Sequence, residues 1–153
     1  MDKFSKCYKF FMLAILSLFM LTGCMTTNGN LASAPASYDQ QMANDTANQL
    51  AVLYPPAQTR LDIKQSISNT DNYGKALIQY LRLKGYAINV GDQNNKPDSL
   101  TPGLNFQYLV DVVPDGSNYY RVTITIGQQT LSQVYRPAQN GKVYPAGSWV
   151  RKE

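Results

Sequence analysis

The longest apolar run of the chain lies near its start, at residues 10–21, and contains no charge. Lys3, Lys6 and Lys9 precede it, and the small residues Thr22 and Gly23 follow it. A basic segment, a short apolar core and small residues at the cut are typical of a secretory signal. The run is shorter than the roughly 20 apolar residues that a membrane-spanning helix needs. The pattern therefore predicts an export signal.

The end of this run predicts where the signal is cut. Leu21, Thr22 and Gly23 lead directly into Cys24, which makes a lipobox. We expect cleavage of residues 1–23, a diacylglyceryl group on the thiol of Cys24 and an acyl chain on its new amine. The alternative is an uncleaved anchor helix with a chance cysteine. Polar sequence begins immediately after Cys24, which favours cleavage.

Residues 24–37 are mostly small and polar, a composition typical of a flexible tether. Extended fully, the tether from lipid to domain would reach roughly 40 Å. Met25 follows the cysteine, where an aspartate tends to retain lipoproteins of Gram-negative bacteria in the inner membrane. The sequence therefore favours the outer membrane, with the protein facing the periplasm. Residues 38–153 are predicted to form a single domain.

Helical periodicity occurs twice in this domain. Apolar residues recur at three- and four-residue steps in residues 38–54, and Pro55 and Pro56 end the pattern. A second stripe runs through residues 72–84, with Asp71 available to cap its start and Gly85 suited to its end. We expect two amphipathic helices.

Alternation of apolar and polar residues predicts the strands. It occurs in residues 59–67 and 86–90, and most clearly in residues 106–113 and 119–126, which flank the turn sequence that begins at Pro114. A third strand is expected at 129–136, followed by a tail with short apolar pairs. The order of elements predicts an α+β fold: a small, mostly antiparallel sheet with two helices on one face.

Charge and composition exclude several classes of function. Three lysines and one aspartate leave with the signal, so the net charge falls from +4 to about +2. Such a balanced chain does not suggest a nucleic-acid groove. The domain has no histidine, and Cys24 would be blocked by lipid. The residues that most nucleophilic catalysis and zinc binding require are therefore missing, and we expect no enzyme, no metal and no cofactor beyond the covalent lipid.

Asp92 and Asp98 flank a polar loop that lacks the ordered oxygen spacing of a calcium site. We interpret it as a surface loop.

Tyrosine is frequent, with 11 residues in the chain. Tyrosine favours protein interfaces, because its ring buries area while its hydroxyl keeps a polar partner. We assign one group to the edge of the core (Tyr73, Tyr80, Tyr86, Tyr108 and Tyr120). The candidates for a partner interface are Tyr119, Tyr135, Tyr144 and Trp149. The tail around Trp149 either pairs with the sheet of another chain or folds back onto this domain's core.

Several segments in order resemble the TrbH family of conjugal transfer lipoproteins. They are the lipobox, Leu53-Tyr54-Pro55-Pro56-Ala57 with Thr59-Arg60-Leu61, Asp71-Asn72-Tyr73-Gly74-Lys75-Ala76-Leu77 running into Leu81-Arg82-Leu83-Lys84-Gly85-Tyr86-Ala87, and Ala146-Gly147-Ser148-Trp149-Val150-Arg151. The resemblance implies a structural component of a type IV secretion machine, in the outer-membrane assembly. It also implies a domain similar to the small N-terminal domains of secretin channels. Of individual residues it assigns a role only to Cys24, the lipid attachment point.

Three functions remain open. The first is a scaffold anchored by lipid that docks against other secretion-channel subunits. The second is a pilotin-like assembly lipoprotein that escorts a channel subunit in a transient complex. The third is a free-standing periplasmic module that binds cell-wall glycan or a small ligand through its aromatic residues.

Overall fold

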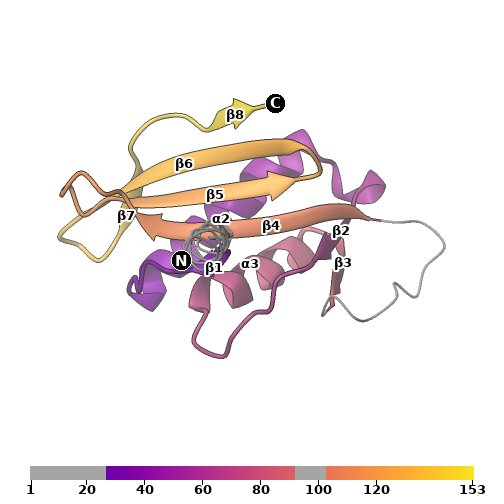
Figure 1. The fold of residues 1–153 in the computed structure, drawn as a ribbon, viewed down its shortest axis with the longest axis horizontal. Helices are drawn as coiled ribbons and strands as arrows, with labels where there is room; N and C mark the ends of the chain where they lie inside the picture. The colour runs from indigo at the N-terminus through magenta and orange to yellow at the C-terminus, as the bar shows by residue number, and fades with distance from the viewer. Residues whose placement is uncertain (1–26, 92–102) are drawn as a thin grey trace, which may run out of the picture.

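In the computed structural model, residues 27–91 and 103–153 are described, and they form an α+β domain. The helices are α2 (Ala36–Leu53) and α3 (Asn72–Leu83), with a short 3-10 helix η2 (Pro56–Gln58). The strands are β1 (Gly29–Asn30), β2 (Arg60–Ile63), β3 (Ala87–Val90), β4 (Leu104–Val112), β5 (Tyr120–Ile126), β6 (Gln129–Pro137), β7 (Val143–Pro145) and β8 (Val150–Lys152) (Figure 1).

All eight strands belong to one sheet, in the order β3-β2-β4-β5-β6-β7. The strands β4, β5 and β6 pair antiparallel, as the alternation in their sequences predicts. The pairs β2–β3 and β2–β4 are parallel, so the sheet is mixed. The β2–β3 pair is parallel because α3 connects these two strands, and a strand–helix–strand connection returns the chain in the same direction.

The long strands β4 and β6 each pair with two short strands along the same edge. Along β4, β2 pairs with Leu104–Phe106 and β1 pairs with Leu109–Val110. Along β6, β8 pairs with Thr130–Ser132 and β7 pairs with Tyr135–Pro137. Both ends of the described chain are therefore short strands added to the edges of a three-stranded centre.

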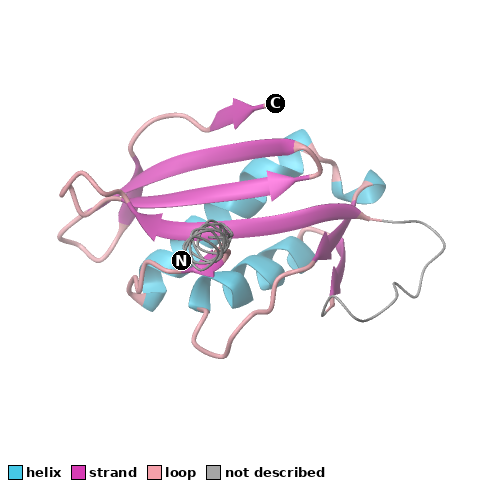
Figure 2. Cartoon of the chain, viewed as in Figure 1, coloured by secondary structure: helices cyan, strands magenta, loops and turns pink. Residues whose placement is uncertain are grey.

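The two helices lie on the same face of the sheet (Figure 2), as the order of elements predicts. Alternate side chains of β4, β5 and β6 face the helices and are buried: Phe106, Tyr108, Val110, Val122, Ile124, Ile126, Leu131, Gln133 and Tyr135. The apolar stripes of α2 and α3 meet them and supply Met42, Ala43, Ala47, Leu50, Tyr73, Leu77 and Leu81. The core is thus one layer of side chains between sheet and helices.

The start of α3 is set by its cap and by a glycine. The Asp71 carboxylate accepts a hydrogen bond from the Gly74 backbone N–H at 2.7 Å, which satisfies one free donor of the first turn. A β-carbon on Gly74 would lie 1.9 Å from the Tyr108 hydroxyl oxygen. Glycine is therefore needed here so that the first turn of α3 can lie against β4.

The predicted surface loop with Asp92 and Asp98 lies outside the described residues. Within the described residues, two segments in the first part of the domain differ from the sequence predictions. Residues 59–67 form a strand only as far as Ile63, and the side chain of Gln65 then accepts a hydrogen bond from the Tyr108 backbone N–H at 2.8 Å. Residues 29 and 30, which we expected within a flexible tether, pair with β4. Two residues are too short to show alternation, so no local pattern marks them as a strand.

Candidate anchoring and partner-binding sites

The predicted lipidation site, Cys24, and its lipobox residues Leu21, Thr22 and Gly23 lie outside the described residues. The structure does show where the chain that follows them goes. Gly29 and Asn30 pair in parallel with Leu109 and Val110, and the Leu31 backbone N–H donates to the Val110 carbonyl at 2.8 Å. The segment that leads from Cys24 thus becomes part of the sheet.

A side-chain contact fastens this first strand to α2. The Asn30 Nδ2 group donates to Asp39 Oδ2 at 3.0 Å, and Asn30 Oδ1 accepts from the Ala32 backbone N–H. Asp39 is 1 % exposed, and its other oxygen, Oδ1, has no protein partner among the described residues. Burial raises the pKa of Asp39 from 3.8 to about 6, the Asn30 hydrogen bond opposes this shift, and the charge of Asp71 adds to it. This carboxyl group is therefore incompletely satisfied.

The other end of the chain is fastened to α2 by a second carboxylate. The Trp149 indole N–H donates to Asp45 Oδ2 at 3.2 Å, and the Tyr135 hydroxyl donates to the same oxygen at 2.6 Å. Trp149 packs against the core, and the Gln133 amide donates to the Gly147 carbonyl at 3.0 Å. Of the two arrangements expected for the tail, the structure has the one that folds back onto the domain.

The four aromatic candidates for a partner interface do not share one surface. Tyr135 is 1 % exposed and belongs to the core, because its position on β6 faces the helices; burial also raises its pKa, so its hydroxyl remains a donor. Trp149 is half-buried, as described above. Tyr119 is half-buried in the β4–β5 turn, where its carbonyl accepts from the Val113 N–H. Tyr144 on β7 is exposed and accepts a hydrogen bond from Asn140.

The tyrosines that we assigned to the edge of the core lie in the core or pack against it. Tyr73, Tyr86 and Tyr108 are buried, while Tyr80 and Tyr120 are partly buried against the core. The Tyr108 hydroxyl donates to Asp71 Oδ2 at 2.6 Å, and the Tyr73 hydroxyl and Thr46 share a hydrogen bond of 3.0 Å. Burial raises the pKa of both tyrosines, so the hydroxyls stay protonated and act as donors or acceptors.

These buried contacts reveal a feature that the sequence analysis missed. Asp39, Asp45 and Asp71 all lie close to the buried tyrosines between sheet and helices. The only local signal in the sequence is the position of Asp39 on the buried stripe of α2, near Met42, and of Asp45 beside it, next to Thr46. A carboxylate on such a stripe requires a donor from elsewhere in the fold.

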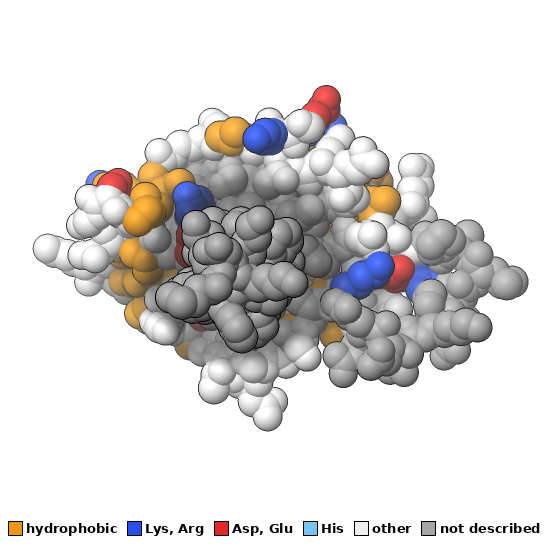
Figure 3. Space-filling view, viewed as in Figure 1, with side chains coloured by type: hydrophobic (Ala, Val, Ile, Leu, Met, Phe, Trp, Pro, Cys, Tyr) orange, Lys and Arg blue, Asp and Glu red, His pale blue; other side chains and the backbone are white. Residues whose placement is uncertain are grey.

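Exposed hydrophobic side chains are spread over several elements, and some of them lie at one end of the sheet. Leu31, 55 % exposed, follows β1, and Val112, 42 % exposed, ends β4. Figure 3 shows hydrophobic side chains at the left of the view, toward the end of the sheet that carries the β4–β5 and β6–β7 turns. The opposite edge strand β3 also exposes Val90. The most exposed hydrophobic side chains, Val52, Leu83 and Val150, lie elsewhere, on α2, α3 and β8.

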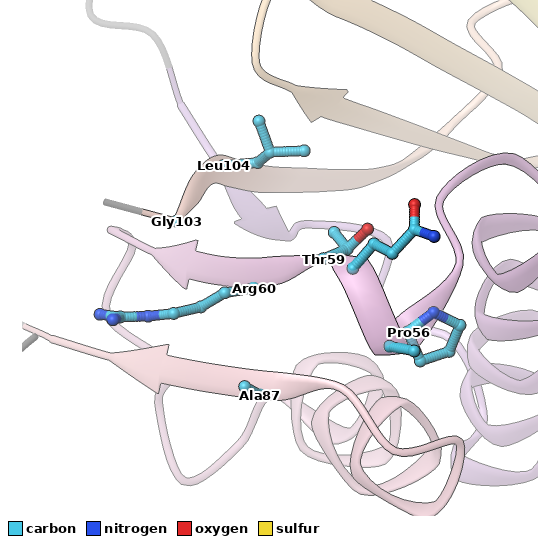
Figure 4. A pocket seen from close by; sticks show the side chains of 8 residues that line it. Pro56, Thr59, Arg60, Ala87, Gly103 and Leu104 are labelled. Atoms are coloured by element: carbon cyan, nitrogen blue, oxygen red, sulfur yellow. The ribbon is translucent and has the colours of Figure 1, made fainter. Parts of the chain in front are cut away.

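A pocket of about 520 Å³ lies where η2 meets the starts of β2, β3 and β4 (Figure 4). Its lining includes Pro56, Thr59, Arg60, Ala87 and Leu104. The Arg60 guanidinium forms an ion pair with Asp62 at 3.3 Å. Among the described residues that line it, no nucleophile is paired with a base.

Within 27–91 and 103–153, no three Asp, Glu, His or Cys side chains are grouped so that they could hold a metal ion. In the same part of the chain, no helix combines the length and apolar character that crossing a membrane requires.

The structure defines the protein as an α+β domain in which residues at both ends of the described chain form hydrogen bonds to helix α2. A family model described as conjugal transfer protein TrbH matches residues 23–153. The chain therefore belongs to the TrbH family of conjugal transfer proteins. No curated protein matches the chain, and no solved structure matches it. The likeness to secretin N-terminal domains accordingly stays a prediction.

Proposed function

We propose that this chain is an outer-membrane lipoprotein that acts as a structural or assembly component of a conjugative type IV secretion system. Membership of the TrbH family carries the proposal, because the match covers the whole chain from Gly23 onward and makes the protein a conjugal transfer component. In this proposal the protein has no catalytic activity, no cofactor other than its lipid and no direct contact with nucleic acid.

The anchor in this proposal is Cys24. The apolar run, the lipobox and the polar sequence that follows support lipidation, and Met25 supports delivery to the outer membrane on its periplasmic side. Each buried methylene of an acyl chain contributes about 0.8 kcal/mol to membrane binding, and stable anchoring needs two chains or more. A diacylglyceryl group carries two acyl chains, so it is sufficient for stable anchoring.

The partners in this proposal are other secretion-channel subunits. Exposed Tyr144 and half-buried Tyr119 support a contact at the end of the sheet that carries the turns. The outer edge of β3, which pairs with no other described strand, is a second candidate, since Ala87–Val90 has neither charge nor proline to discourage pairing with another strand. Trp149 and Tyr135 are already engaged with Asp45, so they support the domain instead.

Affinity purification from cells that express the conjugation machine tests the proposal. Wild-type protein, extracted from membranes with detergent, is compared with Cys24→Ser and with Tyr144→Ser, and Val52→Ser is the matched control on an exposed helix position. We expect channel subunits with the wild type and the control, several-fold fewer with Cys24→Ser, and fewer with Tyr144→Ser.

Recovery of no secretion component from these cells would overturn the scaffold function and favour a free-standing binding lipoprotein. Recovery of one channel subunit, only during assembly and in equal amount, would favour a pilotin-like role.

A further inference from the structure

The first strand, β1, is attached to the edge of β4 by a short backbone contact. β2 pairs with β4 only as far as Phe106, and the Gln65 side chain then accepts a hydrogen bond from the Tyr108 N–H. Beyond this point β1 pairs with β4 over two residues, and the Leu31 N–H donates to the Val110 carbonyl at 2.8 Å. The departure of β1 would therefore leave the pairing of β2 with β4 in place.

Side-chain packing adds little to this attachment. Leu31 is 55 % exposed, and the apolar residues that follow it, Ala32 and Ala34, are small and only partly buried against the core. A pocket of about 210 Å³, large enough to hold water, lies between β1 and the loop of residues 66–71. The side of β1 that faces this loop is therefore not closely packed.

Two features of the attached strand are unfavourable. Asp39, which accepts the hydrogen bond from Asn30, is buried, and its second oxygen has no protein partner among the described residues. Ser33 has a φ of +47°, in the left-handed region that residues other than glycine rarely adopt. Release of β1 would let water replace Asn30 at the Asp39 carboxyl group and would let Ser33 relax. Both features reduce the difference in free energy between the attached and the released strand.

The state of β1 sets how far the domain can lie from its anchor. Asn28 directly precedes β1 and is four residues after Cys24. A chain extends by at most about 3.6 Å per residue, so with β1 attached the connection spans no more than about 14 Å. With β1 released, the connection continues to Ala36, where α2 begins, and spans up to about 43 Å. One short strand thus changes the reach of the domain about threefold.

We infer that β1 is a releasable strap, which holds the domain beside the lipid anchor while it is paired with β4 and extends the reach of the domain when it is released. This inference rests on the proposed lipidation of Cys24. A partner subunit that lies beyond the shorter span binds only the released form, so its binding shifts the population toward release. The helices and the other strands stay folded in both states, because their pairing does not depend on β1.

A proline at position 31 tests the strap. Leu31→Pro removes the N–H that donates to Val110, whereas Leu31→Ala keeps this N–H and shortens the same exposed side chain. The full lipidated proteins are placed in vesicles of phosphatidylethanolamine and phosphatidylglycerol with a small share of dansyl lipid, which accepts energy from Trp149, the single tryptophan of the chain. We expect energy transfer to be weaker by roughly twofold or more in Leu31→Pro than in wild type and Leu31→Ala, because the reach is longer. Circular dichroism should show a folded domain in all three proteins.

Hydrogen exchange of the wild-type protein tests whether the strap opens on its own. We expect the Leu31 amide to exchange faster than the amides in the centre of β5 by roughly tenfold or more. Exchange as slow as in β5, equal energy transfer in Leu31→Pro and Leu31→Ala, or unfolding of the whole domain in Leu31→Pro would each overturn the strap. A Cys24 without lipid in the mass spectrum would overturn the anchor and the control of reach, and the exchange rates would still decide whether β1 opens separately.

Discussion

The two ends of the described chain are attached to the domain in similar ways, but the attachment of the N-terminal end is less complete. Each end adds a short strand to the sheet, and each is fastened to α2 by one aspartate. At the C-terminal end, Asp45 accepts hydrogen bonds from both Tyr135 and Trp149. At the N-terminal end, Asp39 accepts one from Asn30, and its second oxygen has no protein partner among the described residues.

The difference shows that Trp149 attaches the C-terminal end to the core, although β8 itself is exposed, while β1 is attached to α2 through the single side-chain contact of Asn30. Trp149 packs against buried residues, whereas β1 pairs over only two residues. Opening a segment requires less free energy where fewer apolar contacts hold it. The weaker attachment is at the end that leads to the predicted lipid, so release of β1 would lengthen the connection without unfolding the domain.

The largest expected effect is the loss of Trp149. Trp149→Ala removes a half-buried ring and the indole donor to Asp45, and we expect the free energy of unfolding to fall by about 2–4 kcal/mol. Urea denaturation followed by circular dichroism measures the change. Trp149→Phe is the control that keeps a ring and should cost clearly less. A loss below about 0.5 kcal/mol would mean that the tail is not part of the core.

Removal of Asp45 should have the next largest effect. Asp45→Ala leaves the buried Tyr135 hydroxyl and the Trp149 N–H without their acceptor, so we expect destabilisation of about 2–3 kcal/mol. Asp45→Asn keeps an acceptor oxygen and should be milder. Equal stability of the alanine and asparagine variants in thermal unfolding would show that these hydrogen bonds do not hold the tail.

The contact at the N-terminal strand should contribute less. Asn30→Ala breaks its hydrogen bond to Asp39, and we expect a loss of about 1 kcal/mol. Hydrogen exchange should accelerate at the Leu31 amide, which bonds to Val110, and remain slow in the centre of β5. Faster exchange throughout the sheet would contradict the separate, weaker attachment of β1.

Asp39 should make the free energy of unfolding depend on pH below neutrality. Because its pKa is raised to about 6, the folded protein holds this proton over the range from about pH 4 to 6, in which the unfolded chain releases it. The free energy of unfolding should therefore fall as pH rises through this window. Asp39→Asn, which has no charge to bury, should lose this part of the pH dependence. An identical pH profile for both proteins would contradict the raised pKa.

Much of the fold was predictable because its signals are local. The helix at 72–84 follows from a stripe, a cap at Asp71 and a glycine at position 85, all within one short segment. The β4–β5 hairpin follows from alternation on both sides of the turn that begins at Pro114. The parallel part of the sheet was less accessible, because β2 is only four residues long and its partners are set by the crossover through α3.

The burial and the partners of individual side chains were less predictable than the helices and strands. Tyr135 and Tyr144 look alike in the sequence, yet one faces the helices and the other faces solvent. Trp149 could be placed in a tail by its position, but its partner Asp45 lies 104 residues earlier. Likewise, nothing near Gly29 and Asn30 indicates that they join a strand about 80 residues away.

The sequence alone determined the two helices, the central hairpin, the α+β class and the resemblance to the TrbH family, and it predicts an export signal with a lipobox. Each depends on residues within a few positions of one another, or on the order of such segments. The tertiary structure decided which carboxylates meet which donors, which tyrosines are buried and how β1 shortens the connection to Cys24. These depend on contacts between distant segments, which form only when the sheet and α2 come together.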